Sequence, residues 1–205
     1  MSRTTILATG LLALFLSATP ALATDYDIDP NHTDVGFKVK HAGVSNVRGS
    51  FTGVSGTVSY DEAHPENTTI SVKIDANTVD TNVEARDNHL RGPDFFDTQL
   101  YPSLTFVSTE FKSWDAETGT LTFAGDLTMH GVTKSITMTI TDITPELTSE
   151  KGGTRRAATA TAAISRKEWG LTMDGMASAG EIMIGDTVNI TIETELHKAE
   201  PKPVV

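Results

Sequence analysis

The sequence predicts an all-β protein, either a sandwich or a closed antiparallel barrel of about eight strands, with one short helix. Apolar and polar residues alternate in eight separate segments. Turn-forming residues separate these segments at fairly regular intervals, and a helical pattern is confined to residues 81–92. Closure into a barrel would remove exposed strand edges. Periodicity alone does not distinguish a barrel filled by its own side chains from one that holds a ligand.

The first 23 residues have the pattern of a cleaved secretory signal. Arg3 precedes an apolar run over residues 6–16, and a small-residue sequence at 21–23 matches a cleavage site. The run is too short for a comfortable membrane span, so we expect export to the periplasm or the medium and no stable membrane insertion. Residues 24–197 are predicted to form one domain, followed by a disordered tail at 198–205 that contains two prolines.

Composition excludes several classes of function. The chain has 205 residues, a formal charge of −11 and no cysteine. An acidic chain does not attract nucleic acid by bulk electrostatics. Without cysteine, neither disulfides nor thiolate chemistry is available, so an exported protein of this kind must be held together by its core.

The strands are predicted in chain order from period-2 alternation. The clearest segments are residues 35–39, 51–60, 70–74, 104–111, 155–165 and 188–192. In the fifth of these, alanines at 158, 160 and 162 share a face with Ile164, and such small residues leave space inside a barrel or admit a covering helix.

Residues 120–141 predict a hairpin whose register follows from its turn. His130-Gly131 can form a two-residue turn, because glycine adopts positive φ freely and histidine is enriched there among other residues. That turn pairs Met129 with Val132 and places Phe123 opposite Met138. It sorts both strands into a mainly apolar and a mainly polar face, with Lys134 as the charged exception on the apolar face.

The helix is expected to begin with a capping box between Thr81 and Glu84 and to end at Gly92-Pro93. A lone helix in a chain of strands usually covers an open end of the sheet or barrel. Arg86, His89 and Arg91 lie on or beside it and suggest two interpretations. They could meet the phosphate, carboxylate or polar headgroup of a ligand, or they could pair with acidic neighbours at 87, 94 and 97 and hold the helix and loop in place.

No catalytic or metal motif is evident. The sequence lacks a nucleophile elbow, a phosphate loop, a dinucleotide fingerprint and closely spaced histidine pairs. We therefore expect no enzyme activity, no metal and no cofactor.

Several stretches together resemble the YceI family. They are residues 86–96 (RDNHLRGPDFF) with Tyr101-Pro102 and 104–106, residues 125–134 (GDLTMHGVTK), 165–167 with Gly170-Leu171, and the run 28–33 with Phe37, His41, Gly49 and Phe51. The resemblance extends from about residue 26 to 196. One departure is His130, where many members have asparagine, and the predicted turn tolerates either residue.

The resemblance implies a single lipocalin-like antiparallel barrel that holds a long amphiphile in its lumen, such as a polyisoprenoid, a prenylated quinone or a prenyl pyrophosphate. It implies binding for transport, storage or sequestration, sometimes linked to bacterial stress responses, and no catalysis. Headgroup candidates are Arg86, His89 and Arg91. The lumen candidates are Val35, Phe37, Ile70, Val72, Phe95, Phe96, Leu104, Phe106, Leu121, Phe123, Ile136, Met138, Ile140, Ala160, Trp169, Val188 and Ile190.

Some of these candidates have simpler interpretations. At least one of Phe95 and Phe96 is expected to be ordinary core, and Trp169 is better explained as an anchor packed against the barrel than as a platform for a substrate. Two other functions stay open: an enzyme acting on an isoprenoid lipid, and a ligand-free structural or stress protein with a solid core. The oligomeric state is also open, with a homodimer as one alternative.

Overall fold

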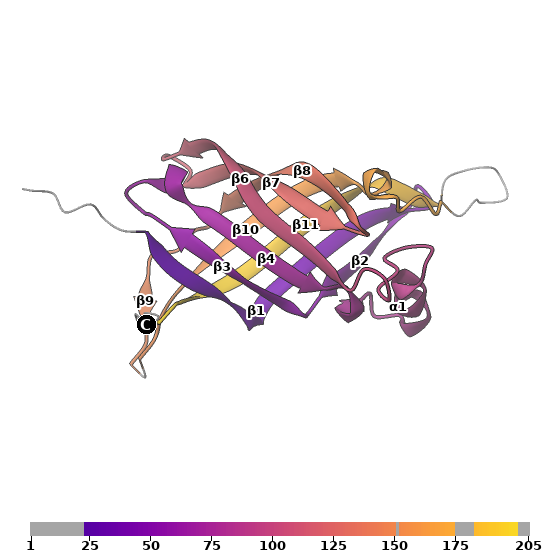
Figure 1. Cartoon of the computed structure of the whole chain (residues 1–205), viewed down its shortest axis with the longest axis horizontal. Helices are drawn as coiled ribbons and strands as arrows, with labels where there is room; N and C mark the ends of the chain where they lie inside the picture. Colours follow the sequence, from indigo (N-terminus) through magenta and orange to yellow (C-terminus); the bar gives the residue numbers. More distant parts are fainter. Residues whose placement is uncertain (1–22, 151, 175–182, 201–205) are drawn as a thin grey trace, which may run out of the picture.

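Extended backbone dominates the chain, as the alternation predicts. The computed structural model describes residues 23–150, 152–174 and 183–200. The strands are β1 (Thr24–His41), β2 (Ser45–Phe51), β3 (Val54–Tyr60), β4 (Thr69–Asp75), β5 (Val79–Asp80), β6 (Ser103–Asp115), β7 (Thr120–Met129), β8 (Val132–Thr141), β9 (Leu147–Thr148), β10 (Thr154–Ser165) and β11 (Ile184–Lys198). The helix α1 spans Glu84–Arg91, and three 3₁₀ turns are η1 (Pro65–Asn67), η2 (Ala76–Thr78) and η3 (Arg166–Trp169) (Figure 1).

Eight of these strands close into an antiparallel barrel, which confirms the predicted fold class. Neighbours around the barrel are β1, β3, β4, β6, β7, β8, β10 and β11, and β11 pairs again with β1. The long strand β1 makes closure work by changing partners: Thr24–Asp27 pairs with β3, and Val35–His41 pairs with β2. A register shift against β11 between Ile28 and Thr33 separates the two halves of β1. The sandwich alternative is therefore excluded.

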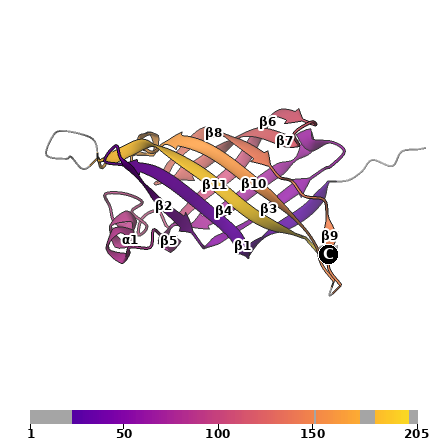
Figure 2. The ribbon, with the colours of Figure 1, turned by 180° about the vertical axis from the view of Figure 1, so that it is seen from behind.

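The two ends of the barrel differ. α1, β2 and β5 lie at one end, and β9 and the last described residues lie at the other (Figures 1 and 2). We call these the helix end and the β9 end. Within the described residues, no helix is long and apolar enough to cross a membrane.

The β7–β8 hairpin has the predicted register. Met129 pairs with Val132 and Phe123 with Met138, and both turn residues have positive φ, 51° at His130 and 73° at Gly131. Phe123 and Leu121 are almost fully buried, whereas Lys134 is exposed near the turn. The turn thus determines which face of both strands points inward.

The predicted start of the helix was wrong, and its predicted end was confirmed. Val83, not Thr81, precedes the first helical residue, and no side chain caps the helix. Thr81 instead donates its backbone N–H and its hydroxyl to Asp87 Oδ1 at 2.8 and 2.5 Å. The helix ends before Gly92 as predicted, but Gly92 has φ −75° and makes no use of glycine's left-handed freedom.

Strand lengths also differ from the predictions. β1 begins at residue 24, whereas the predicted segment began at 35. The sequence analysis missed the first half of this strand because alternation is weak in the acidic segment around Pro30. The predicted segment 51–60 is divided between the end of β2 and all of β3, with a break at residues 52–53. The predicted signal segment lies almost entirely outside the described residues.

Candidate ligand-binding site

The barrel encloses a cavity of about 560 Å³ that reaches the helix end. Every barrel strand except β3 contributes to its wall, and Leu90 of α1 with Phe95 and Phe96 lines it from the helix end. The polar side chains in the lining are confined to five residues: Lys40, His41, Arg86, His89 and Arg166. Its volume falls in the usual range for small-molecule sites, about 300–1,000 Å³.

The interior of the barrel is not filled by its own side chains. Apart from the five polar residues named above, its lining is apolar, so the lumen offers an apolar surface that a ligand chain can bury. The lumen is hollow and apolar, so an occupant that fills it is physically favoured, and the solid-core alternative does not describe this barrel.

Hydrogen bonds from α1 and aromatic contacts fix the helix end. Arg91 donates from Nη2 to the carbonyl oxygen of Val79 at 2.7 Å, which ties α1 to β5. The Phe96 ring packs edge-on against Phe51 of β2 with centroids 5.5 Å apart. Burial alone would raise the pKa of the Asp87 carboxyl, but the two hydrogen bonds from Thr81 and the positive charges of Arg91 and Arg86 together lower this pKa.

The three headgroup candidates are not equivalent. Arg86 and His89 line the large cavity, whereas Arg91 does not. Arg86 donates to the hydroxyl and carbonyl oxygens of Thr81, and His89 contacts Asp94 at 3.1 Å. Of the predicted acidic partners, only Asp94 forms an ion pair with these cations among the described residues. Arg91 therefore braces the helix, while Arg86 and His89 both brace the loop and face the lumen.

A second, smaller cavity of about 80 Å³ lies toward the β9 end. It shares four lining residues with the large one: Val35, Val72, Met138 and Ile192. The two cavities therefore adjoin within one barrel interior. The smaller cavity also has a buried cation, Arg156, in its wall.

The predicted lumen residues fall into three groups. Eleven line the large cavity: Val35, Phe37, Val72, Phe95, Phe96, Leu104, Phe106, Ile136, Met138, Val188 and Ile190. Four others line only the smaller one: Ile70, Leu121, Ile140 and Ala160. Phe123 and Trp169 line neither. The Trp169 indole is 1% exposed and donates to the carbonyl oxygen of Leu127 at 3.1 Å, so it anchors η3 to the barrel.

Sequence reasoning missed some lining residues that alternation could have found. Ile192 shares the parity of Val188 and Ile190, and Arg156 shares the parity of Ala158 and Ala160. Arg156 was overlooked because a charged residue is not expected to point inward. Arg166 and Leu171 could not be assigned, because they lie in a segment without periodicity.

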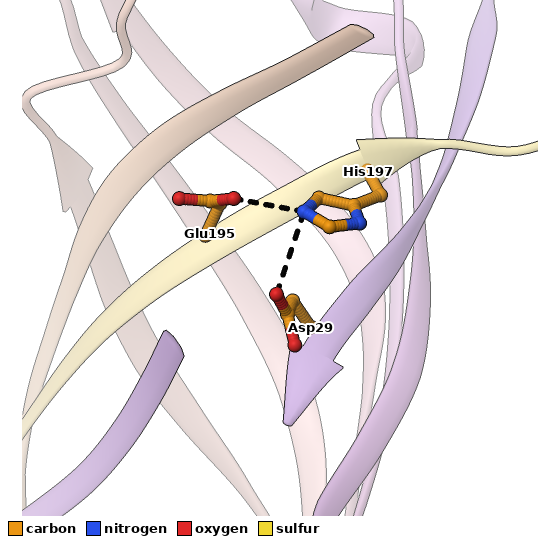
Figure 3. A group of neighbouring side chains, drawn as sticks. All are labelled: Asp29, Glu195 and His197. Atoms are coloured by element: carbon orange, nitrogen blue, oxygen red, sulfur yellow. Dashed lines mark hydrogen bonds and ion pairs between the residues drawn. The ribbon is translucent and has the colours of Figure 1, made fainter. Parts of the chain in front are cut away.

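Outside the lumen, Asp29, Glu195 and His197 form a group of donor atoms within 4.8 Å of one another (Figure 3). His197 Nε2 lies 2.8 Å from Glu195 Oε1 and 3.4 Å from Asp29 Oδ2. His32 donates to Asp29 at 2.7 Å, which lowers the pKa of Asp29 and raises that of His32. These atoms could hold a metal ion, but they also satisfy one another, so the expectation of no metal remains a prediction.

The structure defines this protein as a closed eight-stranded antiparallel barrel with an apolar interior, and barrels of this size can hold one small ligand. The comparisons with known proteins agree with this architecture. The chain belongs to the YceI family: residues 26–196 match the model of the YceI-like domain.

Relatives cover nearly the whole domain. A UPF0312 protein of Pseudomonas putida is 37% identical over 180 residues, which is 87% of this chain and 92% of that protein. The crystal structure of a Campylobacter jejuni YceI protein is 32% identical, with a TM-score of 0.65, over 84% of this chain and 96% of that one. A polyisoprenoid binding domain from Saccharophagus degradans has the same fold at 17% identity, with a TM-score of 0.59, over 87% of this chain and 99% of that one.

Proposed function

We propose that this chain is an exported binding protein that holds a long-chain amphiphile of the polyisoprenoid type in the barrel lumen. The ligand would be a prenylated quinone, a prenyl pyrophosphate or a similar lipid, bound for transport, storage or sequestration. Export to the periplasm or the medium, after removal of residues 1–23, belongs to the proposal. The observation that supports it most directly is the apolar cavity of about 560 Å³.

The physical chemistry of the lumen favours an alkyl or prenyl chain. Each buried methylene contributes about 0.8 kcal/mol, so ten of them give about 8 kcal/mol before the costs of ordering the chain and the protein. This is sufficient for useful affinity without any polar contact. The Saccharophagus degradans domain with the same fold is described as polyisoprenoid binding, which agrees with this choice of ligand.

Binding without catalysis explains the lining better than an enzyme does. The candidate base is His89, which is oriented by Asp94, but both side chains are 54% exposed. A catalytic pair is normally held in a more enclosed site, where burial adjusts its pKa. If the protein is nevertheless an enzyme acting on a prenyl lipid, His89→Gln would abolish turnover of that lipid.

The first test is mass spectrometry of the organic extract of the purified mature protein, with native mass spectrometry of the intact chain. We expect a stoichiometric isoprenoid or a similar long-chain amphiphile. A protein that is empty and also fails to bind added prenyl lipids would refute the proposal. Cell fractionation and N-terminal sequencing of the isolated protein test export and cleavage.

A variant pair tests whether the ligand occupies the barrel interior. Ala160 faces Ile140 and Ile192 across neighbouring strands and lines the smaller cavity. Ala160→Phe would fill this part of the lumen and shorten the space for a chain. Ala163→Phe is the matched control, because Ala163 lies on the exposed outer face of the same strand. We expect weaker binding of a long prenyl chain only for Ala160→Phe. Equal binding by both folded variants would show that Ala160 does not line the ligand site.

A further inference from the structure

The smaller cavity contains hydrogen-bonding groups without partners. Among the described residues, three buried side-chain atoms have no hydrogen-bond partner: Nε and Nη1 of Arg156, and the hydroxyl oxygen of Thr68. Arg156 is 3% exposed and Thr68 is 5% exposed, and both residues line this cavity. Unsatisfied groups of this kind are rare in native proteins, and each one calls for an explanation.

Arg156 differs in this respect from the arginines at the helix end. Arg166 is also buried, but its three nitrogens all donate to backbone carbonyls or to Asp174. All three side-chain nitrogens of Arg91 donate as well. Nε and Nη1 of Arg156 have no hydrogen-bond partner among the described residues, so these two donors are suited to an acceptor that comes from outside the chain.

The charge of Arg156 is only partly balanced by the protein. Its guanidinium lies over the rings of Tyr26 and Tyr60, with its central carbon 5.2 and 4.7 Å from their centroids. These aromatic faces hold the cation in place. Among the described residues, the carboxylate that forms an ion pair with Arg156 is Glu62, which is 73% exposed and reaches Nη2 at 3.4 Å. A buried cation with so weak a counterion favours an anionic partner.

We infer that Arg156 binds the anionic end of the lumen ligand, with Thr68 as an accessory donor, so that the ligand chain extends from the β9 end toward α1. The inference rests on the proposed function and specifies the chemical class of the ligand, which is a long chain with a terminal carboxylate or phosphate. The two cavities share Val35, Val72, Met138 and Ile192, so a chain with its end at Arg156 passes these side chains into the large cavity. This orientation is opposite to one with the headgroup at Arg86 and His89.

The test compares two ligands with the same chain, geranylgeranoic acid and geranylgeraniol, by displacement of a fluorescent lipid from the mature protein. A charge-assisted hydrogen bond contributes about 1.5–3 kcal/mol, so the wild-type protein should bind the acid at least about tenfold more tightly than the alcohol. Arg156→Met should remove this preference and keep the binding of the alcohol. Arg155→Met is the matched control, because Arg155 is adjacent on β10 and pairs with Glu195 on the outer face. Arg155→Met also removes one positive charge but should leave the preference for the acid over the alcohol intact.

The outcomes separate this inference from the proposed function. If the wild type binds both ligands equally, or if Arg156→Met keeps the preference for the acid, the assignment of Arg156 is wrong. If Arg86→Met abolishes the preference instead, the anionic end lies at the helix end. If neither ligand binds the wild type, the proposed function fails, and this inference fails with it.

Two further measurements complete the test. Thermal unfolding of Arg156→Met shows whether the variant is folded, and Thr68→Val provides an independent change of nearly equal volume that should also reduce the preference. Inorganic phosphate and acetate, which have no chain, should stabilise the wild type no more than Arg156→Met. Stabilisation by these ions that depends on Arg156 would indicate a small-anion site and would overturn the inference.

Discussion

Arg166 is expected to be the most important single side chain for the stability of the helix end. It is 4% exposed and connects η3, the segment that follows it, and the start of β11. Its guanidinium donates to the carbonyl oxygens of Leu171, Met173, Ile184 and Gly185, and to the Asp174 carboxylate. Arg166→Met would leave four backbone carbonyls without this donor.

The expected loss follows from these bonds. Removing one partner of a buried, hydrogen-bonded charge usually costs about 3–5 kcal/mol. For a domain of this length that corresponds to a melting temperature lower by about 6–20 °C. Lys167→Met is the matched control, because Lys167 also pairs with Asp174, but both side chains are about one-third exposed. An exposed pair of this kind contributes less than about 1 kcal/mol.

The assay is urea unfolding of the wild type and both variants, followed by hydrogen exchange of the native proteins. Arg166→Met should lower the unfolding free energy and speed hydrogen exchange at residues 171–174 and 184–185. Both effects should be much smaller for Lys167→Met. A loss below about 1 kcal/mol for Arg166→Met, or equal losses for both variants, would refute the reasoning.

Two further predictions concern pH. The hydrogen bond to Asp29 raises the His32 pKa, and the one from His32 lowers the Asp29 pKa. Their mutual stabilisation is therefore lost as pH rises through the raised His32 pKa and as pH falls through the lowered Asp29 pKa. In urea unfolding, His32→Gln should destabilise the protein most between about pH 4 and 6, where both groups are charged, and least well above the raised His32 pKa. An effect that does not depend on pH would contradict this. Burial, and then the hydrogen bond to Glu146, raises the Tyr26 pKa to about 12, so the folded state holds this proton more tightly than the unfolded state and stability should decline as pH rises above about 10. Tyr26→Phe should reduce this decline, and an unchanged slope of unfolding free energy against pH would show that Tyr26 is not its source.

Local sequence patterns predicted the parts of the fold that depend on local chemistry. The His130-Gly131 turn set the register of a hairpin of about twenty residues, because two residues with positive φ determine which side chains face each other. Alternation placed Phe106, Met138 and Ile190 on the inward face for the same reason, since side chains in a strand alternate between two faces. The family resemblance then indicated a barrel rather than a sandwich.

Tertiary structure decided what depends on distant segments. Pairing of β1 with β11 closes the barrel, and no sequence pattern near residue 30 or residue 190 predicts this pairing. The predicted capping box failed because Asp87 accepts the Thr81 backbone N–H that Glu84 would need, and Arg86 Nε donates to the Thr81 hydroxyl oxygen. This competition is visible only in three dimensions.

The same holds for the interior. Sequence alone predicted which residues point inward, but not that the lumen stays hollow, since that depends on how far apart the closed barrel holds its walls. Parity with Ala158 and Ala160 could have placed Arg156 on the inward face, but the sequence analysis did not assign it. Only the tertiary structure shows Arg156 buried against Tyr26 and Tyr60, with two donors free. Hydrogen-bond partners come from elements far apart in the chain, so whether a buried group is satisfied is a property of the folded barrel.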